Sequence, residues 1–265
     1  MKSKNAPSIL TAFASLALIG TSDAALVTGT WTSAQGGGPI TNENTASPTV
    51  GDGTANSADS DALYSAMPTI ALANVGEKVT LSGSANLIGI ASGQVRQFRW
   101  GLYNVNSSAD INGWLGYFAT QGSGTTVGEA YERKDPNTTQ FFAGGTSNVS
   151  VNVTGGTAPG TGISFASGDY TFTLSLERVA SGLQVESTIT RISDSQDFGT
   201  VSFLDTTPLT YTFDRVGFLI AGNLDADQVQ FSNIDVTLVP EPHSAVLGLI
   251  GSALLLLRRR SHPSA

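Results

Sequence analysis

This 265-residue chain has few side chains that could act as an imidazole base, a thiolate nucleophile or a soft metal ligand. There is no cysteine, and the only histidines are His243 and His262, close to the carboxyl terminus. The rest of the chain therefore cannot form a Ser-His-Asp triad, a histidine-ligated metal site or a thiolate nucleophile. The chemistry that remains is that of carboxylates, acting as a catalytic pair or as oxygen ligands of calcium.

The segment EAYE offers two candidate catalytic carboxylates, Glu129 and Glu132. Glycosidases need two carboxylates that flank the scissile bond, one of them as a general acid. On a strand, a spacing of three residues directs these two side chains to opposite faces. The spacing therefore predicts solvated surface acids rather than a joint catalytic role, and we expect that the protein is not an enzyme.

The segment NLDADQ places oxygen ligands at alternate positions, Asn223, Asp225 and Asp227. Calcium loops often begin in this way, but the twelfth position from Asn223 is Ile234 and not the bidentate glutamate of an EF-hand. Two interpretations follow, a calcium site or a polar turn between two strands. No other cofactor is predicted. A second candidate calcium set comprises Asp52, Asp59 and Asp61.

Aromatic side chains could form a platform for sugars, because aromatic rings pack against the apolar faces of pyranose rings. Trp100 is in phase with Phe98 and Leu102 and is therefore expected in the core. Tyr103 faces the other way on the same predicted strand, and Trp114 directly follows the polar segment SSADING. These two residues, Tyr103 and Trp114, are the candidates for binding a polysaccharide.

The apolar residues that must position these groups recur with period two, which is typical of strands. In YTFTLSLER (170–178) the residues at alternate positions are apolar, and LQVESTITR (183–191) repeats the pattern after a turn that contains Gly182. These segments are predicted to form a β-hairpin. The other predicted strands are EKVTLSGSANLIG (77–89), VRQFRWGLYN (95–104), WLGYFAT (114–120), NVSVNVT (148–154), LTYTFDRVGFLIAG (209–222) and VQFSNIDVTL (229–238).

In the last predicted strand, Val229 and Phe231 are out of phase with Ile234 and Val236, which predicts a bulge near Asn233. No stretch between the termini has convincing helical periodicity. Ten or more strands joined by short turns indicate an all-β fold, an antiparallel β-sandwich or jelly roll. Segment 34–65 is rich in Gly, Ser, Thr, Asn and Asp and is expected to be a long polar loop.

The amino-terminal segment, residues 1–24, resembles a signal peptide. Two lysines precede an apolar run at 8–19, and the small residues Ser22 and Ala24 fit a signal peptidase site before Ala25. We therefore expect export through the Sec translocon and cleavage by signal peptidase. Absence of disulfides leaves an exported domain dependent on its hydrophobic core.

Charge excludes one class of partner. Of the 13 Lys and Arg residues, five lie in the terminal segments, as do two of the 21 Asp and Glu residues, so the part between has a net charge of −11. Binding to nucleic acid needs clustered cations that neutralise phosphates. We therefore expect no nucleic-acid partner.

The carboxyl-terminal segment contains 14 consecutive uncharged residues, 244–257, followed by Arg258–Arg260. As a helix this run would be about 21 Å long at about 1.5 Å per residue, whereas a bilayer core of about 30 Å asks for about 20 residues. Arginine side chains at its end can reach the interface and keep that end in the cytoplasm. We therefore predict a short transmembrane helix, which Pro240 and Pro242 separate from the last strand.

The sequence VPEP, the short apolar segment and the terminal arginine cluster together resemble the PEP-CTERM sorting signal of Gram-negative bacteria. This resemblance implies that an exosortase, a membrane cysteine protease, cuts near Pro240, Glu241 and Pro242, with Arg258, Arg259 and Arg260 forming the basic end of the signal. The protein would then lie in the inner membrane in transit and afterwards at the cell surface or in the extracellular matrix. His243 departs from the family, which favours Ser or Thr there. The alternative is an ordinary anchor that is never cut.

The order of the predicted strands also resembles that of concanavalin-like jelly-roll domains, over about residues 31–238. The paired Glu-x-Asp-x-x-Glu of related endoglucanases is absent, so the resemblance does not imply their activity. The predicted domains are a signal peptide at 1–24, a β-sandwich at 25–239 and a sorting tail at 240–265.

These features predict an exported, non-catalytic protein of the cell surface or exopolysaccharide matrix, with polysaccharide as its candidate ligand. One alternative is a carbohydrate-active enzyme of concanavalin-like fold. Another is an ice-binding protein, which would need the Thr-x-Thr pairs to form a flat, repeated face. These pairs are Thr28 and Thr30, Thr30 and Thr32, Thr171 and Thr173, Thr188 and Thr190, and Thr210 and Thr212.

Overall fold

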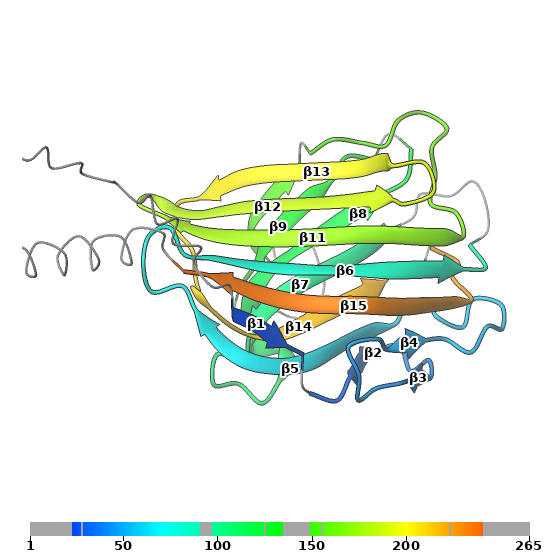
Figure 1. Cartoon of the computed structure of the whole chain (residues 1–265), viewed down its shortest axis with the longest axis horizontal. Coiled ribbons are helices and arrows are strands. Elements are labelled where there is room, and N and C mark those ends of the chain that lie inside the picture. Colours follow the sequence, from blue (N-terminus) through cyan, green and yellow to red (C-terminus); the bar gives the residue numbers. More distant parts are fainter. Residues whose placement is uncertain are drawn as a thin grey trace, which may run out of the picture. The chain divides into compact units, whose positions relative to one another are not determined.

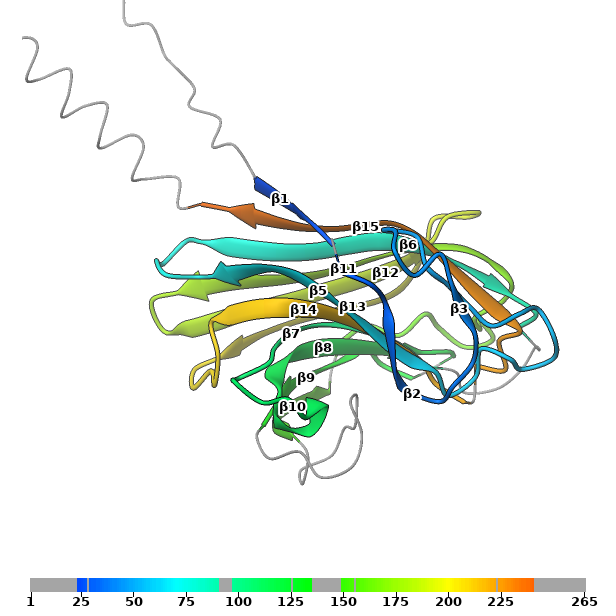
Figure 2. The ribbon, with the colours of Figure 1, turned by 90° about the horizontal axis from the view of Figure 1, so that it is seen from below.

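The computed structural model contains two antiparallel β-sheets packed face to face (Figures 1 and 2). It describes residues 23–27, 29–90, 97–124, 126–134, 149–154, 156–222 and 224–240. The predicted all-β sandwich is thereby confirmed. Most of the predicted signal peptide and the whole tail from Glu241, with its predicted transmembrane helix, lie outside the described residues.

The first sheet has eight strands and takes its members from all parts of the described chain. The short strand β1 (Asp23–Leu26) pairs with β15 outside the main order. The main order is β13 (Gln196–Asp205), β12 (Gly182–Arg191), β11 (Gly168–Val179), β6 (Lys78–Ile88), β15 (Gln228–Val239), β4 (Thr49–Val50) and β3 (Ile40–Thr41).

The second sheet has seven strands. Their order is β10 (Val149–Thr154), β9 (Glu129–Arg133), β8 (Leu115–Gly122), β7 (Gln97–Asn104), β14 (Thr212–Ile220), β5 (Ala62–Ala71) and β2 (Thr32–Gln35). Between β7 and β8 lies η1 (Ile111–Gly113), a single 3-10 turn capped by Asp110. Within the described ranges, no helix has the length and apolar character required to cross a membrane.

The hairpin and the bulge predicted from apolar periodicity are both confirmed. Strands β11 and β12 pair in continuous register from Val179 and Gly182 to Tyr170 and Arg191. In β15 the pairing with β6 shifts between Ser232 and Asp235. Both segments follow their periodicity because each has one face against the core and one toward solvent.

The polar segment 34–65 is only partly the loop that its composition predicts. It contains β3, β4 and the start of β5, and β4 pairs with β15. The free backbone edge of β15 accounts for this difference, because it offers hydrogen bonds to a neighbouring segment whatever that segment's side chains.

The predicted signal peptidase site before Ala25 falls inside β1. Ala25 and Leu26 pair with Val236 and Asp235 of β15. Cleavage at the predicted site would leave these two residues of β1 at the new amino terminus, still in the sheet.

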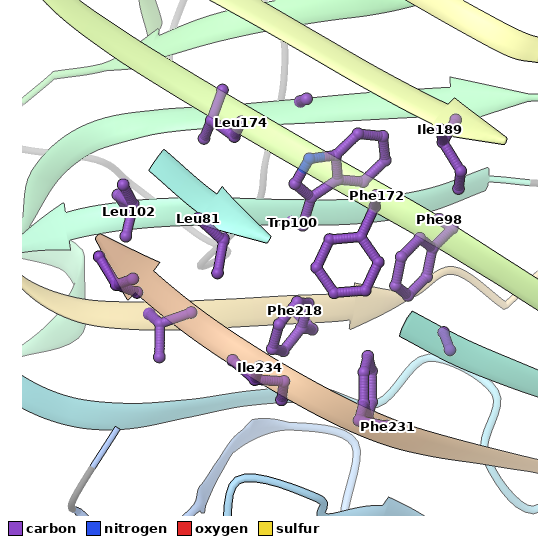
Figure 3. Close-up of a cluster of buried hydrophobic side chains, with 14 of the residues drawn as sticks. Leu81, Phe98, Trp100, Leu102, Phe172, Leu174, Ile189, Phe218, Phe231 and Ile234 are labelled. Carbon is purple, nitrogen blue, oxygen red and sulfur yellow. The ribbon is translucent and has the colours of Figure 1, made fainter. Parts of the chain in front are cut away.

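The core between the sheets is centred on aromatic rings (Figure 3). The Phe218 ring lies 4.5 Å from that of Phe231 and 5.4 Å from that of Phe172, measured between centroids. Trp100 is buried as predicted, and its indole N–H donates a hydrogen bond of 2.8 Å to the carbonyl oxygen of Thr173. This bond joins a strand of one sheet to a strand of the other.

Candidate functional site

The seven-stranded sheet turns one face to the core, and its other face, here called the outer face, carries polar and aromatic side chains in three rows. Each row runs across the strands because the residues are paired in register. The central row is Tyr131, Phe118, Gly101, Gly217 and Tyr64, and the rows beside it are Arg133, Gly116, Tyr103, Arg215 and Ala66, and Glu129, Thr120, Arg99, Leu219 and Ala62.

The two predicted ligand-binding residues, Tyr103 and Trp114, belong to one cluster on this outer face. Gly101 leaves room for Tyr103, because a Cβ there would lie 2.5 Å from the tyrosine hydroxyl. Trp114 packs edge-on against Tyr64 with ring centroids 4.9 Å apart. The exposed fractions are 0% for Tyr103 and 4% for Trp114, so both serve as the packed base of the cluster, and their contact with a ligand stays a prediction.

Tyr64 and Arg215 are the more accessible members of this end of the outer face. Tyr64 is partly exposed, and the Arg215 side chain is 26% exposed. The Arg215 guanidinium lies 5.7 Å from the Trp114 ring centroid and 3.6 Å from a carboxylate oxygen of Asp214. Sequence reasoning missed Tyr64 because it assigned segment 34–65 to a polar loop, whereas the structure places Tyr64 in β5.

At the other end of the outer face, Phe118 and Tyr131 stack with centroids 4.9 Å apart. The Tyr131 hydroxyl donates a hydrogen bond of 2.6 Å to Glu129, and burial followed by this bond raises the pKa of Tyr131. Burial lowers the pKa of Arg99, while nearby Tyr131 and Tyr103 act in the opposite direction. This end of the outer face therefore combines the rings of Phe118 and Tyr131 with the charged side chains of Arg99 and Glu129.

The two glutamates of EAYE do lie on opposite faces of β9, but Glu132 is not a solvated surface acid. Glu129 is partly exposed on the outer face, whereas Glu132 is 0% exposed between the sheets. The Tyr117 hydroxyl lies 2.8 Å from Glu132 Oε1 and 2.6 Å from Asp205 Oδ2. The expectation failed because the inward face of β9 meets the end of β13, a long-range contact that β9's own sequence does not contain.

Glu132 and Asp205 both contact the Tyr117 hydroxyl, but both carboxyl groups are buried. Asp205 is 3% exposed, and the backbone N–H of Leu209 also bonds Glu132 Oε1, at 2.5 Å. A glycosidase pair must flank a substrate. With both acids buried in this way, the pair has no room for a sugar in this structure.

The two aspartate sets predicted for calcium come together in space. Asp227 Oδ1 accepts a hydrogen bond of 2.8 Å from the backbone N–H of Asn56, and Asp59 Oδ1 accepts one of 2.9 Å from that of Ala226. Asp225 has a positive φ of 51°, which suits a turn. Asn223 lies outside the described residues.

Several of these aspartates hold backbone turns. Asp61 Oδ1 accepts bonds from the N–H groups of Gly37 and Gly38, at 2.9 and 3.0 Å, and Asp52 Oδ1 accepts one from Thr54. Nowhere in the described part of the chain do three acidic, histidine or cysteine side chains gather closely enough to hold a metal ion. The hydrogen bonds of these turns are those that the polar-turn interpretation predicts.

Thr28 lies outside the described residues, and the Thr-x-Thr pairs within them do not form one repeated face. Thr173 and Thr188 are on adjacent strands of the eight-stranded sheet, with hydroxyl oxygens 2.8 Å apart. Thr32 and Thr212, in contrast, belong to the seven-stranded sheet. The register therefore unites only two of the pairs, those of β11 and β12.

The fold and site define this chain as an antiparallel two-sheet β-sandwich with an aromatic and charged outer face. No family model matches the chain, and no curated protein does. Solved structures that resemble it in part include the metal-free carbohydrate recognition domain of Emp46p (TM-score 0.46, 9% identity, 79% of this chain and 87% of that one). Lectin II from Ulex europaeus is similar with a TM-score of 0.48 and 9% identity, covering 83% of this chain and 97% of that one.

The exoplasmic/lumenal domain of VIP36, in its Ca²⁺/Man-bound form, gives a TM-score of 0.43 and 7% identity, covering 80% of this chain and 82% of that one. At such identities and TM-scores these similarities do not assign a function to the chain.

Proposed function

We propose that this chain is an exported, non-catalytic β-sandwich that binds polysaccharide through the outer face of its seven-stranded sheet. The observation that carries the proposal is the pair of partly exposed side chains on that face, Tyr64 and Arg215, which both pack against the Trp114 ring. Phe118 and Tyr131 lie in the same row as Tyr64 but are only 0% and 7% exposed, so they belong to the packed base of the cluster. Aromatic rings pack against the apolar faces of sugars, while guanidinium groups donate hydrogen bonds to their oxygens.

The cluster also has the support that a binding site needs. Trp114 holds the Tyr64 ring edge-on, and its own indole N–H donates to the carbonyl oxygen of Ser108 at 3.3 Å. A ring fixed in this way loses little conformational entropy when a ligand packs on it. Tyr64 is therefore the side chain on which we expect the binding energy to depend most.

Replacing Tyr64 with alanine should weaken retention on the bound polysaccharide roughly tenfold, which corresponds to about 1.4 kcal/mol. The measurement is a pull-down and glycan-array series with the purified chain, followed by titration on whichever polysaccharide retains it. Tyr211→Ala is the matched control, because Tyr211 is also partly exposed but packs under Arg178, outside the outer-face cluster. Equal retention of both variants, or no retention of the wild type, would contradict the proposal.

We also propose that residues 240–265 act as a PEP-CTERM sorting signal after export, and that an exosortase-type protease releases the domain to the surface or matrix of a Gram-negative bacterium. The end of the fold supports this. Strand β15 ends at Val239, and Pro240 directly after it is exposed. A protease would thus find its target peptide immediately outside the folded domain, in extended backbone favoured by the prolines.

Two forms of the chain are expected in cells that contain the protease, a precursor ending near Ala265 and a released form ending between Val239 and Pro242. Glu241→Ala should leave membrane insertion intact and abolish release if the protease reads that carboxylate. Replacing Arg258–Arg260 with serine should let the short helix slip and give release without normal processing. Mass spectrometry of the carboxyl terminus measures each outcome, with Glu186→Ala as a control on the exposed domain surface. A full-length chain as the sole wild-type form would contradict this assignment.

A further inference from the structure

We propose that Tyr117, Glu132 and Asp205 form a proton-dependent clasp between the two sheets, which holds while the two carboxyl groups share a proton and loosens when both ionise. The three residues come from β8, β9 and the end of β13. Strands β12 and β13 lie in front of β8 and β9 in Figure 1. The clasp therefore ties an edge strand of one sheet to the inner face of the other.

The contacts of the Tyr117 hydroxyl require this shared proton. A tyrosine hydroxyl has a single hydrogen, yet a carboxylate oxygen lies 2.8 Å away on Glu132 and another 2.6 Å away on Asp205. The hydroxyl can donate to only one of them. The other contact is favourable only if that carboxyl group is protonated and donates back to the phenol oxygen.

Glu132 is the group that holds the proton. Asp205 is satisfied in the charged form, because its other oxygen, Oδ1, accepts a bond of 2.9 Å from the backbone N–H of Thr207. In contrast, Glu132 Oε2 is buried and finds no hydrogen-bond partner among the described residues. A buried carboxylate oxygen without a donor is costly when charged and much less so as the carbonyl oxygen of a neutral acid.

The electrostatic surroundings agree with this assignment. Burial raises the pKa of Glu132 to about 7, and the negative charge of Asp205 acts in the same direction, against the hydrogen bonds from Leu209 and Tyr117. Burial, followed by the charge of Glu132, raises the pKa of Tyr117 well above its ordinary value, so that the phenol keeps its hydrogen. Around the clasp, β8 contributes Tyr117, β13 contributes Asp205, the segment after β13 contributes the Leu209 amide, and β14 contributes the uncharged ring of Phe213.

The sign of the pH effect follows from proton linkage. The pKa of Glu132 is 4.5 in an unperturbed chain, and burial in the folded chain raises it to about 7. Between these values the folded state binds more protons than the unfolded state, so its stability decreases as the pH rises. The clasp is thus fully formed in acid and is weakened at and above neutral pH.

The test compares melting temperatures of the whole chain between about pH 5 and about pH 8. Glu132→Gln mimics the protonated acid and cannot ionise, so its melting temperature should fall by roughly 5 °C less than that of the wild type across this interval. Glu129→Gln changes the same residue type on the same strand but on the outer face, and it should follow the wild type. If Glu132→Gln keeps the full pH dependence of the wild type, the clasp proposal is wrong.

A second measurement uses only the wild-type chain. Carboxyl carbon resonances of the wild-type chain, followed by NMR from acid to neutral pH, should include one glutamate that titrates near neutrality. Titration of every glutamate in its ordinary range would overturn the proposal.

Discussion

Replacing Phe218 with alanine is expected to lower the free energy of unfolding by about 3 to 5 kcal/mol, the range for removing a large aromatic side chain from a packed core. Phe218 is 0% exposed at the centre of the aromatic core. Its ring centroid lies 5.6 Å from that of Trp31 and 4.5 Å from that of Phe231. Alanine would leave a cavity that the neighbouring rings on β7, β11 and β15 cannot fill without losing their own contacts.

The measurement is chemical denaturation of the wild type and the variant under identical conditions. Leu204→Ala is the matched control, because Leu204 is a large apolar residue in a strand but is 43% exposed. We expect that control to stay within about 0.5 kcal/mol of the wild type. A loss for Phe218→Ala as small as that of the control would show that the core is not closely packed around this ring. The chain has no disulfide, so no covalent link would offset the loss of stability expected for Phe218→Ala.

Gly182→Ala is expected to destabilise the chain by about 2 to 5 kcal/mol, the sum of backbone strain and overpacking. Gly182 starts β12 with φ at +146°, a conformation that side chains disfavour. A Cβ at this position would also lie far inside van der Waals distance of the carbonyl oxygen of Asp205. Both obstacles are in the backbone, so no side-chain rotation can relieve them.

Gly168 provides a control that separates the two contributions. It has nearly the same φ, +145°, but a Cβ there would have no atom within 4 Å. Gly168→Ala should therefore show only the conformational cost, about 1 to 2 kcal/mol. Equal losses at the two positions, measured by thermal and chemical denaturation, would mean that the clash with Asp205 is absorbed by the surrounding backbone.

The clasp and the outer face are formed by neighbouring residues of the same two strands, β8 and β9. Tyr117 faces the core and Phe118 the outer face, while Glu132 faces the core and Tyr131 the outer face. A shift of β9 when the clasp ionises would move Tyr131 together with Glu132. Polysaccharide binding measured at acid and at neutral pH, on wild type and Glu132→Gln, would reveal whether the two sites are coupled.

Most of the strands could be predicted because their signal is local. Alternating apolar residues placed the β11–β12 hairpin, and a break in that alternation located the bulge near Asn233 in β15. The core position of Trp100 followed from the same phase. Composition predicted segment 34–65 less well, because two short strands of this polar segment, β3 and β4, extend the sheet beside β15.

The all-β class and the faces of individual strands can be predicted from the amino-acid sequence, because side-chain direction alternates along a strand whatever lies beside it. Which of those side chains come into contact depends on how the strands are paired and stacked. Tyr64 and Tyr131 share one row through the register of the strands between them, and Glu132 meets Asp205 because β9 and β13 face each other across the sandwich. Register and sheet stacking depend on hydrogen bonds and packing between segments distant in the chain, and burial there turned an apparently ordinary surface glutamate into a proton-holding acid.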